Sequence, residues 1–221
     1  MASDVSIKSI DGRPLKKKGA NTRQRILDVL EALLQDSAAS ELRVARIAEA
    51  ANVAIATFYS YFESLDAALL ALVEQEKFAY AQVMSLLRAP WPESEVAARA
   101  RAFVTAYFEF WDEHRAVLRL RNLRGDEGDA RFLAVRFTFT VPIMDAIAEK
   151  LAVAKAAGRL PPHVPALSFA AVILAALERN GSCYIHINRN SRADLIEASV
   201  QTLVMWLLGA ATIANVQERR P

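Results

Sequence analysis

Apolar residues recur about every three to four positions along most of the chain, which is the spacing of one face of an α-helix. We find no alternating pattern typical of a β-strand, so the sequence predicts an all-α fold. The long helical segments expected from this pattern span about 21–36, 64–87, 93–111, 115–124, 131–157, 166–187 and 193–211.

Two shorter segments, 43–51 and 54–61, lie between the first two of these helices. Asn52 separates them, and Asn tolerates the left-handed backbone that a tight turn needs. Two short helices joined by a tight turn form a helix-turn-helix, whose second helix enters the major groove of DNA. The alternative interpretation is a helical hairpin that merely packs against the core. The apolar face of the first short helix consists of Val44, Ile47, Ala48 and Ala51.

The second short helix cannot be stable alone, since isolated helices below about 12–15 residues are marginal in water. Phe58 and Phe62 lie four residues apart, so we expect both rings to anchor the helix against its neighbours. The opposite side would then present Ile55, Ala56, Tyr59 and Ser60.

Small side chains at Ala54 and Ala56 would let the start of this helix approach DNA closely. Tyr59 offers a hydroxyl to a phosphate. Thr57 and Ser60 can bond a phosphate or a base edge.

The composition is that of a folded chain, with 53% hydrophobic and 24% charged residues. The formal net charge of +2 does not point to nucleic acid, but the charge distribution is uneven. Residues 12–27 carry six basic side chains and no acidic one, which fits either a solvated tail or an arm that contacts phosphates. These basic residues are Arg13, Lys16, Lys17, Lys18, Arg23 and Arg25.

Residues 20–76 resemble the N-terminal domain of TetR-family transcriptional regulators. The resemblance rests on three stretches, "TRQRILDVLEALL", "VARIAEAANVAIATFYSYF" and "SLDAALLALVE". It implies that 43–51 is the supporting helix and 54–61 the recognition helix. The basic run itself predicts a flexible basic arm at 1–18. The resemblance implies a DNA-binding domain at 19–64, with its motif at 43–62, and a ligand-sensing and dimerisation domain at 65–215.

The expected DNA partner is a double-stranded operator with an inverted repeat. The expected DNA-contacting residues are Lys16, Lys17, Lys18, Thr22, Arg43, Arg46, Ala54, Ile55, Ala56, Thr57, Tyr59, Ser60 and Tyr61.

Three positions depart from the usual pattern of the family. Asn52 stands where Gly is common, and Ala54 replaces a Ser or Thr cap, which removes about 0.5–2 kcal/mol of capping. Leu65 stands where many members carry a phosphate-contacting Lys, so Arg43, Arg46 or the N-terminal lysines would have to compensate.

The segment 164–177 has one polar side chain, Ser168, and a helix that is apolar all round must be covered all round. One face can meet its own core, and the last helix and a second subunit can cover the other. The alternative is a central core helix in a monomer. The family pairs its last two helices into a four-helix bundle, which implies a homodimer. The expected interface residues are Val172, Ala176, Val200, Val204, Leu207 and Leu208.

Eight of the chain's 18 aromatic residues fall between Phe103 and Phe139, and "ERNGSCYIHIN" adds polar groups to an apolar helix. Ligand pockets are mostly apolar with a few polar groups, so this region is the candidate effector site. An ordinary aromatic core fits the same residues. The candidate ligand contacts are Phe103, Tyr107, Phe110, Trp111, Arg121, Phe137, Asn180 and Tyr184.

Four arginines crowd residues 115–124, which is typical of a solvated face but would also suit a clamp for an anionic ligand group. Cys183 and His186 share a helical face without a visible third ligand or orienting carboxylate. We find no catalytic motif, and expect neither an enzyme nor a cofactor or bound metal.

A single cysteine and the lack of an apolar leader favour the cytoplasm, and no run is long enough to span a bilayer. The sequence thus predicts a DNA-binding regulator, a repressor released by a hydrophobic or amphipathic small molecule. The alternatives are a helical lipid-binding or scaffold protein without a DNA role, and a metal or redox sensor that uses Cys183.

Overall fold

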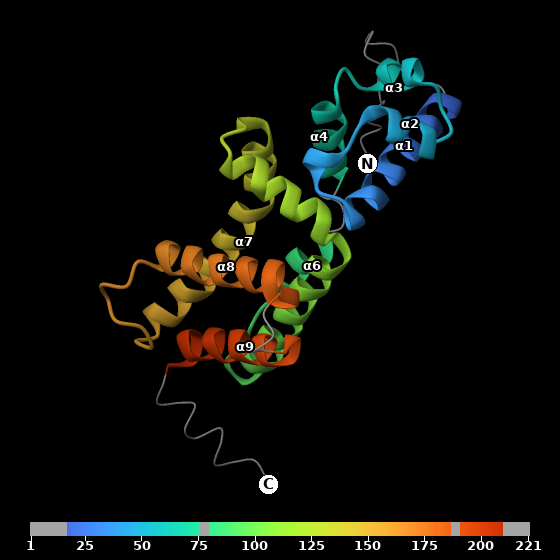
Figure 1. The fold of residues 1–221 in the computed structure, drawn as a ribbon. Helices are drawn as coiled ribbons and strands as arrows, with labels where there is room; N and C mark the ends of the chain where they lie inside the picture. Colours follow the sequence, from blue (N-terminus) through green and yellow to red (C-terminus); the bar gives the residue numbers. More distant parts are fainter. Residues whose placement is uncertain (1–16, 76–79, 187–190, 210–221) are drawn as a thin grey trace. The chain divides into compact units, whose positions relative to one another are not determined.

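The computed structural model describes residues 17–75, 80–186 and 191–209, and the regular elements in these ranges are all helices (Figure 1). The all-α prediction is therefore confirmed. In chain order the elements are α1 (Lys17–Asp36), η1 (Ala39–Glu41), α2 (Val44–Ala50), α3 (Ile55–Tyr61), α4 (Leu65–Gln75), α5 (Ala81–Arg88), η3 (Glu93–Glu95), α6 (Val96–Asp126), α7 (Ala130–Ala156), α8 (Ala166–Cys183), η4 (Tyr184–His186) and α9 (Arg192–Leu208).

The chain divides into two compact units, and the division does not follow the sequence order. The first unit combines residues 1–76 with 116–135, and the second combines 77–115 with 136–221. Long helices α6 and α7 each contribute to both units. The backbone therefore passes between the units three times.

The first unit has one apolar core, built by α1–α4 and closed by residues from 116–135. Fully buried members come from every helix of the N-terminal part, and Val117, Leu120 and Phe132 join them from α6 and α7. Burial of such side chains is the main favourable term in forming the unit. The fully buried residues of the N-terminal helices include Ile26, Leu30, Ile47, Phe58 and Leu69.

Helix α1 begins at Lys17, earlier than the sequence suggested. Lys17 and Lys18 therefore lie in its first turn rather than in an irregular arm. The Thr22 hydroxyl donates to the Lys18 carbonyl at 3.0 Å, a bond typical of a helix interior. Lys16 and the rest of the arm, 1–15, lie outside the described residues.

Helix α6 joins the two segments that were expected as separate helices, and it continues through Gly125, which was expected in a turn. The junction is visible as His114, whose φ of −113° and ψ of 16° leave the helical region. The break expected between the helices at 93–111 and 115–124 is therefore only a local distortion of the backbone within α6.

The turn predicted at Asn52 is confirmed, and side chains cap the starts of two helices. Asn52 has a φ of 51°, the left-handed conformation. The Ser64 hydroxyl accepts from the Ala67 amide at 3.1 Å near the start of α4. Ser191 and Asp194 form a complete capping box at the start of α9, which satisfies two of the amides that helices leave unpaired there.

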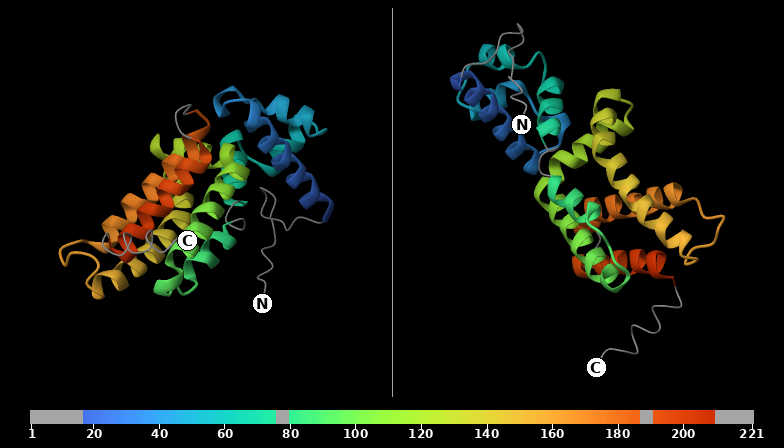
Figure 2. Two further views of the ribbon diagram at one scale, coloured as in Figure 1. Left: turned by 90° about the horizontal axis from the view of Figure 1, so that it is seen from below. Right: turned by 180° about the vertical axis from the view of Figure 1, so that it is seen from behind.

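The second unit packs α5, most of α7, α8, α9 and the first part of α6. Helices α8 and α9 run alongside each other in all three ribbon views (Figures 1 and 2). Two polar contacts tie α7 to its neighbours. The Tyr80 hydroxyl donates to the Phe139 carbonyl at 2.6 Å, and Arg136 pairs with buried Glu178 at 2.7 Å. In the part of the chain that the structure describes, no helix is long and apolar enough to cross a bilayer.

We predict that Phe58→Ala destabilises the first unit by about 3–5 kcal/mol, the usual cost of removing a fully buried aromatic side chain. Urea titration followed by circular dichroism measures the change. Ile55→Ala on the exposed side of the same helix is the matched control and should leave the free energy of unfolding within about 0.5 kcal/mol. Equal destabilisation by both variants would mean that both sides of α3 are packed.

Candidate functional site

The turn between α2 and α3 is held by backbone hydrogen bonds. The Ala51 amide donates to Ile47 at 2.8 Å, and the Val53 amide reaches back to Ala48 at 2.9 Å. The left-handed Asn52 lies between these two bonds and reverses the chain. The two short helices thereby form the tight pair expected of a helix-turn-helix.

The two sides of α3 differ as the sequence predicted. Phe58 and Phe62 are buried, with ring centres 5.5 Å apart, and they join the core of the first unit. Ile55 and Tyr59 are 49% and 47% exposed. Ala56 and Ser60 complete this exposed side, so an exposed surface of small, apolar and hydroxyl side chains stands on a rigidly anchored helix.

The start of α3 lacks a side-chain cap. Ala54 occupies the cap position with extended backbone, a φ of −68° and a ψ of 150°, and makes no side-chain hydrogen bond. Ala54 is exposed, whereas Thr57 is half-buried. Tyr61 is half-buried and packs on the core, so it offers less surface than Tyr59 does. The Ser60 hydroxyl donates to the Ala56 carbonyl at 3.0 Å, which leaves its oxygen as an acceptor.

The predicted basic contacts lie on exposed parts of the first unit. Lys17 and Lys18 are exposed, and Thr22 is half-buried. Arg43 uses Nη1 to bind the carbonyls of Ser40 and Leu42, each at 2.8 Å, and Arg46 reaches the Ser37 hydroxyl at 3.2 Å. These bonds hold both guanidinium groups near the start of α2 and leave further N–H donors.

One basic residue of the N-terminal run has a structural role. The Arg23 guanidinium lies 4.9 Å from the centre of the Phe62 ring, a distance suited to a cation–π contact. Burial lowers the pKa of Arg23, and the Glu74 carboxylate opposes that shift. Arg23 therefore supports the ring that anchors the end of α3.

Residues 116–135 were missed as part of this region. Arg124 bonds Asp66 of α4 at 3.0 Å, close to where Val117, Leu120 and Phe132 enter the core. Val117 and Leu120 are three residues apart, which is the spacing of one helix face. No feature of the sequence indicates which of the two cores that face packs against.

Four of the predicted ligand contacts are buried side chains of one helix. Phe103, Tyr107, Phe110 and Trp111 are buried on α6, and the rings of Phe103 and Tyr107 lie 6.0 Å apart. Their burial fits an ordinary aromatic core, and their role as ligand contacts stays a prediction.

The other four predicted contacts are dispersed. Arg121 is buried in the first unit, where it donates to Asn122 at 3.0 Å. Phe137 is 51% exposed on α7. Asn180 and Tyr184 are half-buried near the end of α8.

Tyr184 belongs to a polar cluster in the second unit. Its hydroxyl donates to Asp112 at 2.7 Å, and Arg192 donates to the same carboxylate at 2.8 Å. Arg115 also bonds Asp112, donates to the Gly181 carbonyl and lies 4.7 Å from the centre of the Tyr184 ring. Burial and the bond to Asp112 raise the pKa of Tyr184. This cluster ties α6, η4 and α9 together and gives Arg115 a structural partner.

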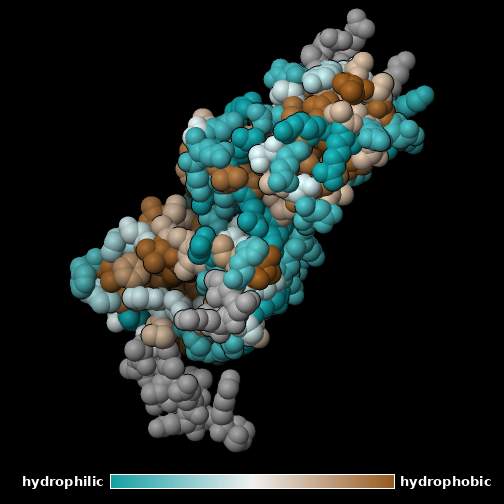
Figure 3. All heavy atoms as spheres, in the orientation of Figure 1, coloured by the Kyte–Doolittle hydropathy of each residue, from teal (hydrophilic) through white to brown (hydrophobic). Residues whose placement is uncertain are grey.

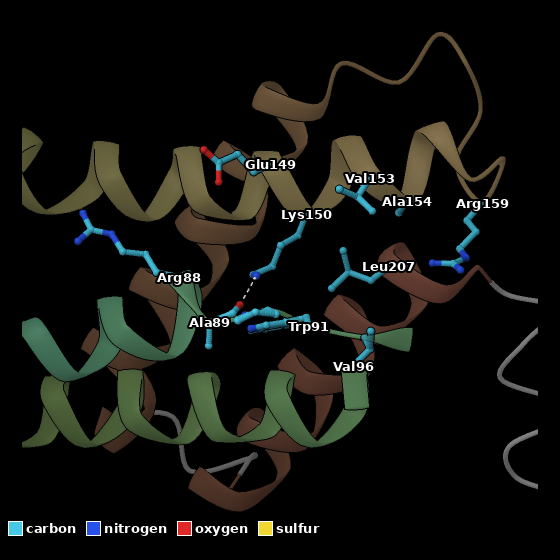
Figure 4. Close-up of a pocket in the computed structure, with 11 residues that line it drawn as sticks. Arg88, Ala89, Trp91, Val96, Glu149, Lys150, Val153, Ala154, Arg159 and Leu207 are labelled. Carbon is cyan, nitrogen blue, oxygen red and sulfur yellow. Dashed lines mark hydrogen bonds between the residues drawn. The ribbon is translucent and has the colours of Figure 1, made fainter. Parts of the chain in front are cut away.

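A pocket of about 330 Å³ lies elsewhere in the second unit (Figure 4). None of the predicted ligand contacts lines it. A feature that could have drawn attention to it is the "PWP" sequence at 90–92, in which two prolines restrict the backbone around a Trp. The lining residues are Arg88, Ala89, Pro90, Trp91, Val96, Glu149, Lys150, Val153, Ala154, Arg159 and Leu207.

The predicted dimer residues fall into two groups. Val172 is 68% exposed and Ala176 is exposed, so α8 has a free apolar side. Figure 3 shows hydrophobic side chains gathered over this helix. The four predicted residues of α9 are instead buried within the chain; they are Val200, Val204, Leu207 and Leu208.

Cys183 ends α8, and its sulfur lies 3.1 Å from the Ser182 hydroxyl oxygen. Within the described ranges, no group of three His, Cys, Asp or Glu side chains is arranged to hold a metal ion.

Two family models match the chain. Residues 26–72 match "Bacterial regulatory proteins, tetR family", and residues 85–206, more than half of the chain, match "Tetracyclin repressor-like, C-terminal domain". The regulator EthR of Mycobacterium tuberculosis is 27% identical over 107 residues, which cover 48% of this chain and 50% of that protein. The chain thus spans about half the length of that relative.

Solved structures share the fold. A tetR-family transcriptional regulator from Streptomyces coelicolor has a TM-score of 0.67 and 20% identity, covering 91% of this chain and 90% of that one. The transcriptional regulator FadR from Bacillus subtilis, in complex with stearoyl-CoA, has a TM-score of 0.63 and 13% identity. That match covers 84% of this chain and 98% of the other.

We predict that Gly181→Ala destabilises the second unit by about 1–3 kcal/mol, because overpacking a close helix contact has this cost. A Cβ at this position would lie 2.7 Å from two atoms of the Trp111 ring. Gly125→Ala is the matched control, since its Cβ would meet Leu133 at an ordinary 3.6 Å. It should be neutral or stabilise α6 by up to about 1 kcal/mol. Thermal unfolding of both variants measures the difference, and a stable Gly181→Ala would show that Trp111 moves freely.

Proposed function

The chain belongs to the TetR family of bacterial regulatory proteins, and from this premise we propose that it is a sequence-specific DNA-binding repressor, released from its operator by a small hydrophobic or amphipathic molecule. The observation that carries the proposal is the anchored, half-exposed helix α3. Its buried side fixes its position, and its free side has the size and chemistry that a major groove accepts.

The contacts proposed for α3 follow from its exposed side chains. Ala54 and Ala56 permit close approach of the backbone, and Ile55 offers apolar surface to a thymine methyl. The Tyr59 hydroxyl reaches a phosphate, while Thr57 and Ser60 bond a phosphate or a base edge.

Basic residues around α3 supply the contacts that do not depend on sequence. Arg43 and Arg46 are held by their hydrogen bonds at the start of α2. Lys17 and Lys18 extend the positive surface along the first turn of α1, and Lys16 would add to it. Phosphate contacts of this kind position the protein on the duplex and provide much of its affinity.

We further propose that two copies of the chain associate through the exposed side of α8. That side is apolar and made largely of small residues, so a second helix can approach it closely. Apolar surface left exposed in this way typically marks an interaction site. Its exposed apolar residues are Leu167, Ala171, Val172, Ala175 and Ala176, and the exposed Ser168 and Arg179 lie near its two ends. A symmetric pair would present two α3 helices to one face of the DNA, about 34–36 Å apart, and so read an inverted repeat.

In this proposal residues 19–64 bind DNA and 65–215 bind the effector and the second subunit. Release requires the effector to bind the DNA-free state better than the DNA-bound one. A near-complete switch needs a preference of about 5.5 kcal/mol. The same linkage requires the operator to weaken effector binding by an equal factor.

We predict that affinity for an operator duplex falls linearly on a log–log salt plot, with a slope of about −0.9 per phosphate neutralised. Fluorescence anisotropy with operator and unrelated duplexes measures it. Replacing Lys17 and Lys18 by Gln should make the slope shallower by about one unit per lost contact and leave the site preference unchanged. Tyr59→Phe should weaken all duplexes equally, because it removes a phosphate contact.

Lys155→Gln, in the second unit, is the matched control for these charge changes. Wild-type protein whose DNA affinity does not depend on salt would contradict the proposal and favour a helical carrier or scaffold. Release of DNA by oxidants or metal ions that is lost in Cys183→Ala would instead favour a sensor based on that thiol.

We predict that Val172→Asp converts the dimer to a monomer, because a buried unpaired carboxylate costs several kcal/mol. Sedimentation velocity measures the mass in solution. Val153→Asp is the matched control, since Val153 is also 68% exposed but lies on α7. A Val172→Asp protein that remains dimeric would place the interface elsewhere.

A further inference from the structure

The pocket of Figure 4 is built by four helices of the second unit and the loop that follows α5. The end of α5 and the loop at 89–91 form one side, α7 forms the opposite side, and Val96 and Leu207 come from α6 and α9. Its volume of about 330 Å³ lies at the lower end of the range for small-molecule sites, roughly 300–1,000 Å³. A ligand for it must therefore be small.

The most informative group in the pocket is Lys150. Its ammonium donates to the Ala89 carbonyl at 3.1 Å and lies 4.5 Å from the centre of the Trp91 ring. The Trp91 indole in turn donates to the Leu86 carbonyl at 3.0 Å, which fixes the ring. Within the described residues, no carboxylate lies within ion-pair distance of the ammonium. One of its three donors is used by Ala89, and the others remain for a ligand.

The charges around the pocket favour an anion. Its lining includes three basic side chains, Arg88, Lys150 and Arg159, and one acidic side chain, Glu149. Figure 4 shows the Glu149 carboxylate turned away from the Lys150 ammonium. Arg159 is paired with Glu93, so Lys150 is the cation in the middle of the pocket that has no acidic partner among the described residues. Burial lowers the pKa of Lys150, which a bound anion would counteract.

The remainder of the lining is apolar. Trp91, Val96, Val153, Ala154 and Leu207 surround the space between Lys150 and Arg159. A ligand that fills this space must have an apolar body next to a single negative charge. Burying that body supplies affinity, and the ammonium fixes its orientation.

We propose that this pocket binds a small apolar monocarboxylate, a medium-length fatty acid or an arylalkanoate, with Lys150 as its counter-ion and Trp91 as part of its wall. The site is distinct from the α6 aromatics that the sequence pointed to. Binding here does not depend on the proposed DNA role; only its regulatory consequence rests on that function.

A purely structural role for Lys150 is the competing explanation. Its bond to Ala89 satisfies a carbonyl at the end of α5, where a positive charge also complements the helix dipole. In that case its removal would lower the melting temperature and leave ligand binding unchanged. The test must therefore separate stability from affinity.

The experiment is a calorimetric titration of the full-length protein, without DNA, with octanoate, octanamide and octylamine. These probes share one apolar chain and differ in head group. Octanoate should bind at least about tenfold more tightly than octanamide, because a charge-assisted hydrogen bond contributes roughly that factor. Octylamine should not bind detectably. Equal affinity for octanoate and octanamide, or no octanoate binding up to millimolar concentration, would overturn the proposal.

Four variants locate the site. Lys150→Met should weaken octanoate about tenfold or more and leave octanamide unchanged, whereas Lys150→Arg should keep most of the preference for the acid. Lys155→Met, on the same helix but outside the pocket, should bind octanoate as the wild type does. Val153→Phe should block both octanoate and octanamide, because it fills the pocket from an exposed position.

Circular dichroism and melting curves accompany each variant. Should Lys150→Met fail to fold, Val153→Phe and the comparison of head groups still decide the question. Octanoate binding that survives in both Lys150→Met and Val153→Phe would place the ligand elsewhere. If octanoate binds as expected but does not alter the anisotropy of the DNA complex, the site stands and the proposed release of DNA by this ligand fails.

Discussion

Burial of Phe58 and Phe62 is the constraint on which the first unit depends. A helix of seven residues has too few internal hydrogen bonds to be stable alone, and α3 has no side-chain cap to help it. Its position is therefore set by the core, through two rings and the stacked Arg23. Because the inner side is fixed in this way, the outer side can vary in sequence without loss of the fold.

The second unit relies on a different kind of contact. Its aromatic residues are packed around α6, and Gly181 lets α8 come within contact of Trp111 where any side chain would collide. In addition, charged hydrogen bonds to Asp112 link α6 to η4 and to the start of α9. A pocket of the second unit lies beside the proline-bounded loop, and the α6 aromatics are not among the residues that line it.

Local features of the sequence were predictable because their causes are local. Helical periodicity, the left-handed Asn52 and the two sides of α3 each depend on residues close in sequence. Long-range pairings were not predictable. Nothing near Val117 or Phe132 indicates which core they join, and nothing in the α6 aromatics separates a packed ring from a ligand contact. The apolar stripe of α9 correctly predicted that these side chains are buried. It did not indicate that residues of the same chain, rather than a second subunit, cover them.

The shared core of the first unit also limits how this protein can be taken apart. A fragment that ends near residue 76 would contain every helix of the helix-turn-helix region, yet it would leave uncovered the apolar surface that Val117, Leu120 and Phe132 close. The helix-turn-helix region therefore cannot be separated at a single linker and fused to another protein as an independently folding domain. Any chimera that keeps it intact must also carry the returning segment 116–135, which is formed by the parts of α6 and α7 that belong to the first unit.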